Sequence, residues 1–195
     1  MQVLKEELRT LILKNAEQEF LQKKFENASL RNIAKESGTT IGNIYRYFSN
    51  KEALFDELVK NEYNAFLYLM EHHENAEVDI NHENDKNMNW RDYFQTYLTE
   101  FMPIFTKRFL LLIDRSENTQ YKSARNMVLM TLEQHFDKHF TEYGIRATPG
   151  FTRVLAEQIL TGLLFIIESC EDNKQKQQLI SDMFAFFIEA TLHFS

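Results

Sequence analysis

Residues 29–51 constrain the fold of this chain more than any other segment, because they predict two short helices joined by a tight turn. Ser29 is a favourable N-cap for the first helix, and Gly38 can take the left-handed conformation that often ends a helix. Thr40 can then cap a second helix over about residues 41–47. A short helix, a glycine turn and a second short helix are typical of a helix-turn-helix unit.

The second of these helices has the composition that a DNA groove requires. It carries Tyr45, Arg46 and Tyr47, and no Asp or Glu occurs from Ser37 to Lys51, although the whole chain has a net charge of −7. Ile44 is expected to anchor the helix to the core and to leave those three side chains more exposed. An acid-free helix of this kind is suited to the major groove of DNA.

The charge of the chain is unevenly distributed. Residues 1–51 contain nine basic and six acidic residues, a net +3, whereas the rest contains 13 basic and 23 acidic residues, a net −10. A basic head on an acidic body suggests that only the head meets a polyanion.

Composition predicts an all-α protein of about nine helices. The chain has 195 residues, is 44% hydrophobic, and contains only five Gly and two Pro. We expect a helix-turn-helix head over residues 1–50 and a second, helical body over residues 51–195. The single cysteine, Cys170, fits a reducing compartment. No signal peptide is recognisable and the apolar runs are too short to cross a bilayer, so we expect a cytoplasmic protein with no membrane partner.

Apolar periodicity places the expected elements along the chain. Either Ser49 or Asn50 caps the helix that follows the helix-turn-helix unit. Thr148 is expected to cap a later helix, with Pro149 at its first position. The remaining expectations are helices over about 4–24, 51–71, 90–102, 105–113, 123–143, 149–169 and 177–194, a polar loop over 72–89 and a charged turn over 171–176.

The motifs of residues 29–55 resemble those of the TetR/AcrR family of bacterial regulators. The family pattern is matched by Ile33-Ala34, Ser37-Gly38, Ile44-Tyr45-Arg46-Tyr47-Phe48 and Lys51-Glu52-Ala53-Leu54-Phe55. This resemblance covers about a quarter of the chain. It implies an all-helical homodimer with a ligand pocket in each body.

The resemblance also implies which residues meet DNA. These are Arg31, Thr39, Thr40, Gly42, Asn43, Tyr45, Arg46, Tyr47 and Lys51. Arginine and lysine can hold phosphate, and an asparagine can bond the edge of adenine in bidentate fashion. Several alternatives stay open: Arg31 as a solvated surface residue, Arg46 on guanine or on phosphate, and Tyr47 packed partly inside the head.

For the body, an apolar pocket and a dimer surface are expected. The pocket candidates are Phe94, Tyr97, Phe101, Phe105, Phe109, Met127, Met130 and Phe165. The dimer candidates form one stripe on each of the last two helices: Leu155, Ile159, Gly162, Leu163, Ile166, Leu179, Met183, Phe184, Phe187 and Thr191. Two such helices from each subunit would form a four-helix bundle. Ordinary intrachain core is the alternative for both sets.

His135 and His139 lie one helical turn apart, a spacing that can bind a transition metal, but a solvated face is the favoured interpretation, and no metal or cofactor is expected. The sequence contains no phosphate-binding glycine loop, nucleophile elbow or H-E-x-x-H motif, which disfavours an enzyme. The leading hypothesis is a repressor that binds a palindromic operator as a dimer and is released by a small apolar or amphipathic effector. The alternative is a DNA-bound protein-interaction platform without a small ligand.

Overall fold

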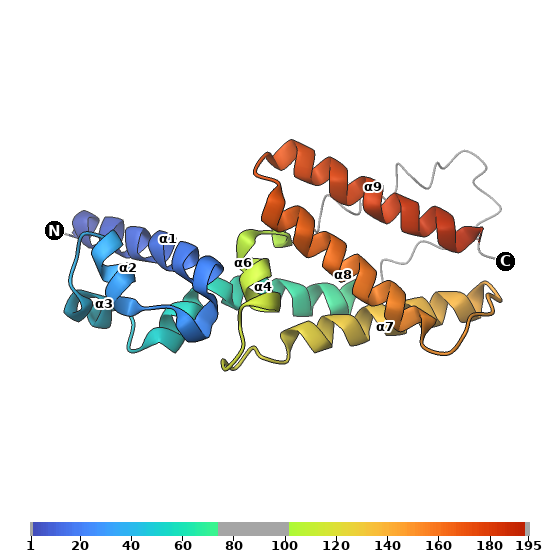
Figure 1. Cartoon of the computed structure of the whole chain (residues 1–195), viewed down its shortest axis with the longest axis horizontal. Coiled ribbons are helices and arrows are strands. Elements are labelled where there is room, and N and C mark those ends of the chain that lie inside the picture. Colours follow the sequence, from blue (N-terminus) through green and yellow to red (C-terminus); the bar gives the residue numbers. More distant parts are fainter. Residues whose placement is uncertain (1, 74–101, 194–195) are drawn as a thin grey trace. The chain divides into compact units, whose positions relative to one another are not determined.

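The computed structural model describes residues 2–73 and 102–193, with side chains for 5–68, 102–191 and 193. Within these ranges the chain is all-α, as predicted, with no strand (Figure 1). No helix in these ranges combines the length and apolar character needed to span a membrane. The elements are α1 (Gln2–Asn27), α2 (Leu30–Glu36), α3 (Ile41–Tyr47), α4 (Lys51–His73), a 3-10 turn (Met102–Ile104), α6 (Lys107–Asp114), α7 (Ala124–Glu142), α8 (Phe151–Ser169) and α9 (Asn173–Leu192).

The chain forms two compact units. The first comprises Met1–Ala65 together with Lys107–Arg125, and the second comprises Phe66–Thr106 together with Asn126–Ser195. The predicted division at residue 50 marks the end of the helix-turn-helix segment, whereas the compact units divide within α4. The expected helix from Trp90 and most of the expected loop at 72–89 lie outside the described residues.

An aromatic cluster joins α1 and α4 in the first unit. The rings of Phe20 and Phe25 meet that of Phe55 edge-on, with centroids 5.1 and 5.3 Å away, and all three side chains are buried. Such a cluster provides a large apolar contact area with a defined geometry. Helix α6 joins this unit through α1, because the Arg108 guanidinium lies 2.9 Å from the Glu17 carboxylate.

The connection between α6 and α7 also belongs to the first unit. Its Tyr121 hydroxyl donates a hydrogen bond to the Asp56 carboxylate of α4 at 2.5 Å, and Gln120 donates to the same oxygen at 2.6 Å. The amide of Phe25 donates to the carbonyl of Arg115 at 3.1 Å. The connection is therefore bonded both to the end of α1 and to α4.

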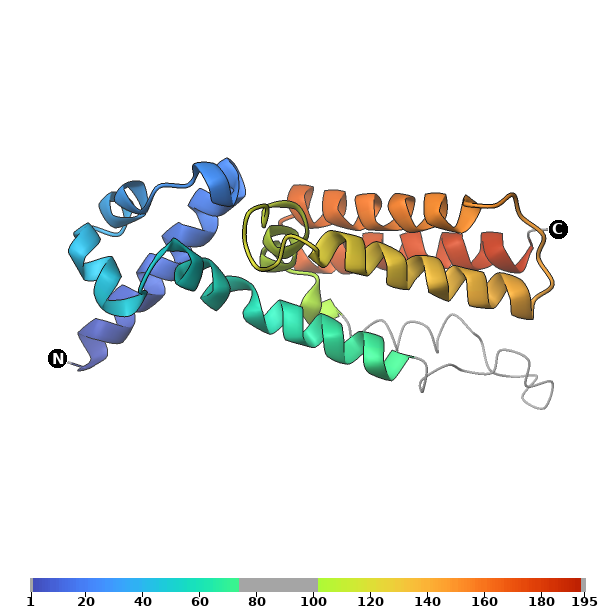
Figure 2. The same ribbon diagram turned by 90° about the horizontal axis from the view of Figure 1, so that it is seen from below.

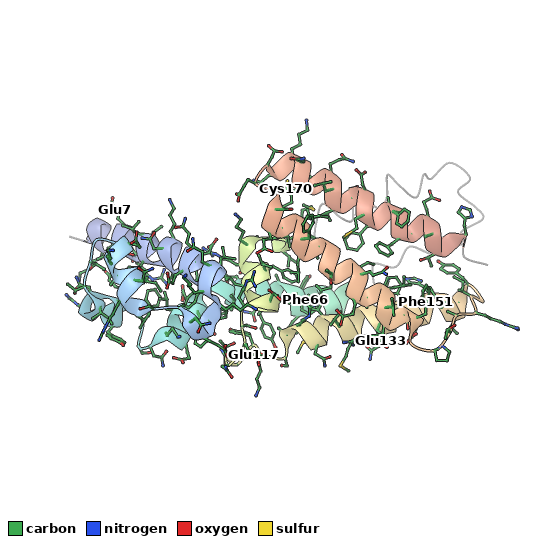
Figure 3. The ribbon with its side chains drawn as sticks, in the orientation of Figure 1. Glu7, Phe66, Glu117, Glu133, Phe151 and Cys170 are labelled. Carbon is green, nitrogen blue, oxygen red and sulfur yellow. The ribbon has the colours of Figure 1, made fainter. Side chains whose placement is uncertain are left out.

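In the second unit α7, α8 and α9 pack together, and α8 and α9 run antiparallel, side by side (Figures 1 and 2). Phe136 and Phe140 of α7 form a buried cluster with Ile159 of α8. Gly162 lets α9 approach closely, because a Cβ at this position would lie 2.8 Å from the sulfur of Met183. Cys170 lies at the turn between α8 and α9 (Figure 3). Its side chain is buried.

Two predicted helix starts are wrong. Helix α8 begins at Phe151 after Gly150, which has φ +85°, so neither Thr148 nor Pro149 has the predicted position. Gly150 takes this left-handed conformation without the steric cost that a Cβ brings, and the turn therefore extends past the proline. Helix α9 begins at Asn173, inside the predicted charged turn, because the Asp172 carboxylate caps it by accepting from the amide of Gln175 at 2.7 Å.

Candidate nucleic-acid interface

The turn between α2 and α3 has the predicted glycine geometry. Gly38 has φ +61°, in the left-handed region. Its amide donates to the carbonyl of Lys35 at 3.0 Å, and the amide of Thr39 donates to the carbonyl of Ala34 at 2.9 Å. These bonds satisfy carbonyls that a helix end leaves without partners, and they fix the direction in which α3 leaves the turn.

Thr40 caps α3, as predicted. Its hydroxyl oxygen accepts a hydrogen bond from the amide of Asn43 at 3.3 Å. The Asn43 side chain donates to the hydroxyl of Thr39 at 3.0 Å. An asparagine amide has two N–H donors and a carbonyl acceptor, so this bond leaves one donor and the acceptor of Asn43 for a base edge.

One side of helix α3 packs against the head, and the other side, which we call the open side, is exposed to solvent. Ile44 is fully buried and Phe48, just beyond the helix, is 5% exposed. Tyr45 is 50% exposed, and Gly42 and Arg46 are also exposed. The anchored residues hold the helix against the head while the open side presents a phenol, a guanidinium and a position without a side chain.

The other two predicted DNA-contacting residues of this region differ in exposure. Tyr47 is half-buried, and its ring centroid lies 6.4 Å from that of Phe48, in agreement with the expectation that it packs partly inside the head. Arg31 is exposed on α2.

A buried carboxylate of α1 accepts hydrogen bonds from the start of α2. Glu19 of α1 is 7% exposed and accepts hydrogen bonds from the backbone amide of Ser29 at 3.1 Å and from the Asn32 side chain at 2.5 Å. Ser29 occupies the N-cap position of α2, but its side chain makes no capping bond. The sequence pattern alone did not identify Glu19 as the partner.

Lys51, which was predicted to hold a phosphate, makes hydrogen bonds within the protein. Its ammonium donates to three backbone carbonyls at the end of α1. The prediction placed this ammonium on a DNA phosphate. Asn50, rather than Ser49, caps α4, because its side-chain oxygen accepts from the amide of Ala53 at 2.7 Å.

The structure describes five of the eight predicted pocket residues. Phe94, Tyr97 and Phe101 lie outside the described residues. Phe105 and Phe109 are buried in different compact units. Met130 is 48% exposed and Phe165 is 68% exposed, so neither faces an enclosed cavity. Met127 of α7 is half-buried.

Much of the predicted dimer stripe packs within the chain. Ile159, Leu163 and Ile166 of α8 are buried. The α9 residues Met183, Phe184 and Phe187, with Leu155 of α8, pack against the cluster around Ile159. Gly162 serves the close approach of α9 within the chain, and Thr191 is half-buried, with its hydroxyl bonded to the Phe187 carbonyl at 2.8 Å. Of the predicted stripe, Leu179 is 40% exposed.

A different face of the α8–α9 pair is apolar and open. Phe165 follows Gly162 by three residues and is 68% exposed, and Phe186 follows Met183 by three residues and is 70% exposed. Because the two helices are antiparallel and meet at Gly162 and Met183, equal offsets from these contacts place both rings on the same side of the pair. We call this surface, with Val154 and Leu179, the outer face. A hydrophobic pattern could not distinguish it from the core, since both sides of α8 are apolar.

The histidine pair of α7 is close in space. The ring centroids of His135 and His139 are 4.3 Å apart, and His139 lies 3.4 Å from the Glu142 carboxylate. Among the described residues no group of three or more His, Cys, Asp or Glu side chains is arranged to hold a metal ion.

The head matches a family of known regulators. Residues 12–58 match the model described as bacterial regulatory proteins, tetR family. The match is to regulatory proteins rather than to an enzyme family, as the sequence analysis expected. No curated protein matches the chain in a sequence search.

Several solved structures are similar to this one at low identity. NalD of Pseudomonas aeruginosa, the secondary repressor of the MexAB-OprM multidrug efflux pump, is 24% identical, with a TM-score of 0.41, over 92% of this chain and 96% of that one. A transcriptional regulator from Aquifex aeolicus VF5 is 18% identical, with a TM-score of 0.49, over 92% and 99%. FadR of Bacillus subtilis, solved with stearoyl-CoA, is 17% identical, with a TM-score of 0.49, over 96% and 99%. These TM-scores are below 0.5, so the family match is that of residues 12–58 alone.

Proposed function

We propose that this chain, a DNA-binding transcriptional regulator of the tetR family, is a repressor that binds a palindromic operator as a homodimer. A small apolar or amphipathic effector bound in the body then releases it from DNA. The regulator acts in the cytoplasm, where the DNA is. The family assignment comes from residues 12–58, and the finer claims are proposals with their own tests.

The open side of α3 carries this proposal. Tyr45 and Arg46 project from a helix that Ile44 anchors, and no acidic side chain lies in the sequence from Ser37 to Lys51. A phosphate backbone would repel carboxylates here, whereas hydroxyl, guanidinium and amide groups bond both phosphates and base edges. The remainder of the chain is acidic, so the head is the part that DNA attracts.

Tyr45→Ala tests the interface, because the side chain is half exposed and its removal leaves the buried anchors intact. We expect weaker binding to the selected operator at unchanged thermal stability. Tyr68→Ala is the matched control, since Tyr68 is 65% exposed on α4 and lies outside the helix-turn-helix. Equal operator affinity for wild type and Tyr45→Ala would contradict the assignment.

Arg46→Ala separates the two contacts that the sequence left open for this residue. Loss of a guanine contact would relax the sequence preference at one position, by about 1–3 kcal/mol for a bidentate pair. Loss of a phosphate contact would lower affinity equally for all sequences and reduce the salt dependence. Binding to a panel of single-base operator variants distinguishes these results.

For the homodimer we propose the outer face as the contact. Phe165 and Phe186 are both more than two-thirds exposed, which is unusual for large aromatic side chains, and a second copy would cover them. Joining two outer faces across a two-fold axis makes a four-helix bundle. A palindromic site requires the same two-fold symmetry, and one small head alone covers too little DNA for tight specific binding.

Sedimentation of Phe186→Glu tests this contact. A carboxylate at the centre of the bundle would be buried without a partner, so we expect monomers at concentrations where the wild type is dimeric. Met130→Glu is the control, because Met130 is 48% exposed on α7 and is not a residue of the outer face. A dimeric Phe186→Glu variant would contradict the proposed contact.

Release by an effector is tested by operator anisotropy with a panel of small apolar and amphipathic compounds. The effector must bind the released state more tightly than the DNA-bound state. A compound that raises thermal stability and releases the operator supports the proposal. Operator binding that no compound weakens favours the alternative, a DNA-bound platform for protein partners.

A further inference from the structure

Lys51 is the first residue of α4, and its side chain turns back to the end of α1. Its Nζ donates hydrogen bonds to the carbonyl oxygens of Phe25 at 2.7 Å, Glu26 at 3.2 Å and Ala28 at 3.2 Å. An ammonium group has three N–H donors and no acceptor. Each donor is therefore directed to a carbonyl of the protein.

The end of α1 is a favourable place for this charge. Carbonyls at a helix end lack partners within the helix and accept hydrogen bonds from donors elsewhere in the protein. The helical path is interrupted at Lys24, with φ 60° and ψ 166°, just before the carbonyls that Lys51 meets. Nζ also lies 4.5 Å from the centroid of the Phe25 ring, which adds a cation–π interaction.

Helix α1 also bonds to the start of the helix-turn-helix, at the opposite end from Lys51. Glu19 of α1 accepts from the Ser29 amide and from the Asn32 side chain, which holds the start of α2. Lys51 follows α3 by only a few residues and holds the chain there to the end of α1. Bonds to α1 therefore hold the chain both before α2, through Glu19, and after α3, through Lys51.

We propose that Lys51 is a positioning residue for DNA binding: it ties the start of α4 to the end of α1 and so fixes the orientation of α3, without contacting phosphate. The inference rests on the proposed DNA binding. It differs from the phosphate contact that the sequence resemblance implies for this lysine.

Salt dependence distinguishes the two roles. Each phosphate contact by a cation contributes about 0.9 to the slope of log affinity against log salt. Lys51→Met keeps the apolar stem beside Phe25 and removes the charge and the donors. We expect its operator affinity to fall on the order of tenfold, about the loss of one well-placed contact, with the wild-type salt slope. Lys51→Arg, which can still donate to the carbonyls, is expected to recover most of the affinity.

Two results of this titration would overturn the proposal. A salt slope reduced by about 0.9 in Lys51→Met means a direct phosphate contact. If Lys51→Met binds the operator with unchanged affinity and only its unfolding temperature falls, the hydrogen bonds of Lys51 affect stability alone. Arg46→Met serves as the comparison, because its exposed cation contributes about 0.9 to the slope if it holds a phosphate.

A measurement on the wild-type protein keeps the test independent of how the variants fold. Acetylation of lysines by an activated acetate ester, read by mass spectrometry, reports how available each amine is. Lys51 should react much more slowly than the exposed Lys35 in the free protein, and added operator should not slow it further. Reaction as fast as at Lys35, with protection by operator, would overturn the tie. If no duplex DNA binds, the proposed function fails. The acetylation rates of Lys51 and Lys35 in the free protein still test whether Lys51 is held by the carbonyls of α1.

Discussion

Removing the hydroxyl of Tyr121 should weaken the first compact unit by a predictable amount. Tyr121 is 7% exposed and donates to Asp56 at 2.5 Å. A hydrogen bond to a charged group contributes about 1.5–3 kcal/mol. In Tyr121→Phe the Asp56 carboxylate keeps the bond from Gln120 at 2.6 Å, and the ring contact with Tyr63, at 5.1 Å between centroids, has no reason to change. We therefore expect a loss near the lower limit, about 1.5–2 kcal/mol.

The pH dependence of this difference has a definite sign. Burial, together with the hydrogen bond to Asp56 and its negative charge, raises the pKa of Tyr121 above its ordinary value in the folded state. A raised folded-state pKa gives stability that is complete below the unfolded-state pKa of about 10 and is lost as the pH rises through the folded-state pKa. The difference between wild type and Tyr121→Phe should be constant from about pH 7 to 9 and should shrink above about pH 10.

Urea unfolding followed by circular dichroism measures both quantities. Tyr45→Phe is the matched control, since Tyr45 is 50% exposed, and its stability should change by less than about 0.5 kcal/mol. The reasoning is refuted if Tyr121→Phe loses less than about 0.5 kcal/mol. It is also refuted if the difference between wild type and variant stays constant, or grows, above about pH 10.

Three other substitutions test the local structure. Gly162→Ala should change the free energy of unfolding by less than about 1 kcal/mol, because the gain in helix propensity offsets the displacement of the flexible Met183 side chain. Gly162→Val should cost about 1–3 kcal/mol. Equal urea midpoints for the two variants would contradict the close approach of α9 to Gly162. Asp172→Ala should cost about 1 kcal/mol and Asp172→Asn much less, and equal losses in thermal unfolding would argue against the cap. Thr40→Ala should weaken α3 by about 1 kcal/mol and lower operator affinity, while Thr40→Asn should keep the cap, so a Thr40→Asn variant as unstable as Thr40→Ala would exclude capping.

The helix-turn-helix could be predicted from the sequence because its determinants are local. Gly38 and Thr40 act through bonds to residues within five positions, and Ile44 is buried because helical periodicity turns it away from Tyr45. The exposure of Tyr45 and the partial burial of Tyr47 follow from the same periodicity. These features need no knowledge of the remaining chain.

The hydrogen bonds of Lys51 could not be predicted in this way. Its partners Phe25 and Ala28 are more than twenty residues away, just beyond the interruption of α1 at Lys24. The bond between Tyr121 and Asp56 is likewise remote in sequence, so no motif signals it.

The outer face was missed for a different reason. Helix α8 is apolar on more than one side, so periodicity gives two candidate stripes, with Ile159 on one and Phe165 on the other. Which stripe is core depends on where α7 and α9 pack. Gly162 gave the useful signal, because a small residue marks a close approach, but the approaching helix is α9 of the same chain rather than a partner.

Selection of binding sites from random duplex DNA, at physiological salt and without added ligand, tests the central claim most directly. We predict enrichment of a palindrome whose half-sites lie about one helical turn apart, bound with a steep dependence on salt. The Tyr45→Ala variant, carried through the same selection, should not enrich it. Failure of the wild-type protein to enrich any sequence, or enrichment that Tyr45→Ala reproduces, would contradict the claim that the open side of α3 reads DNA.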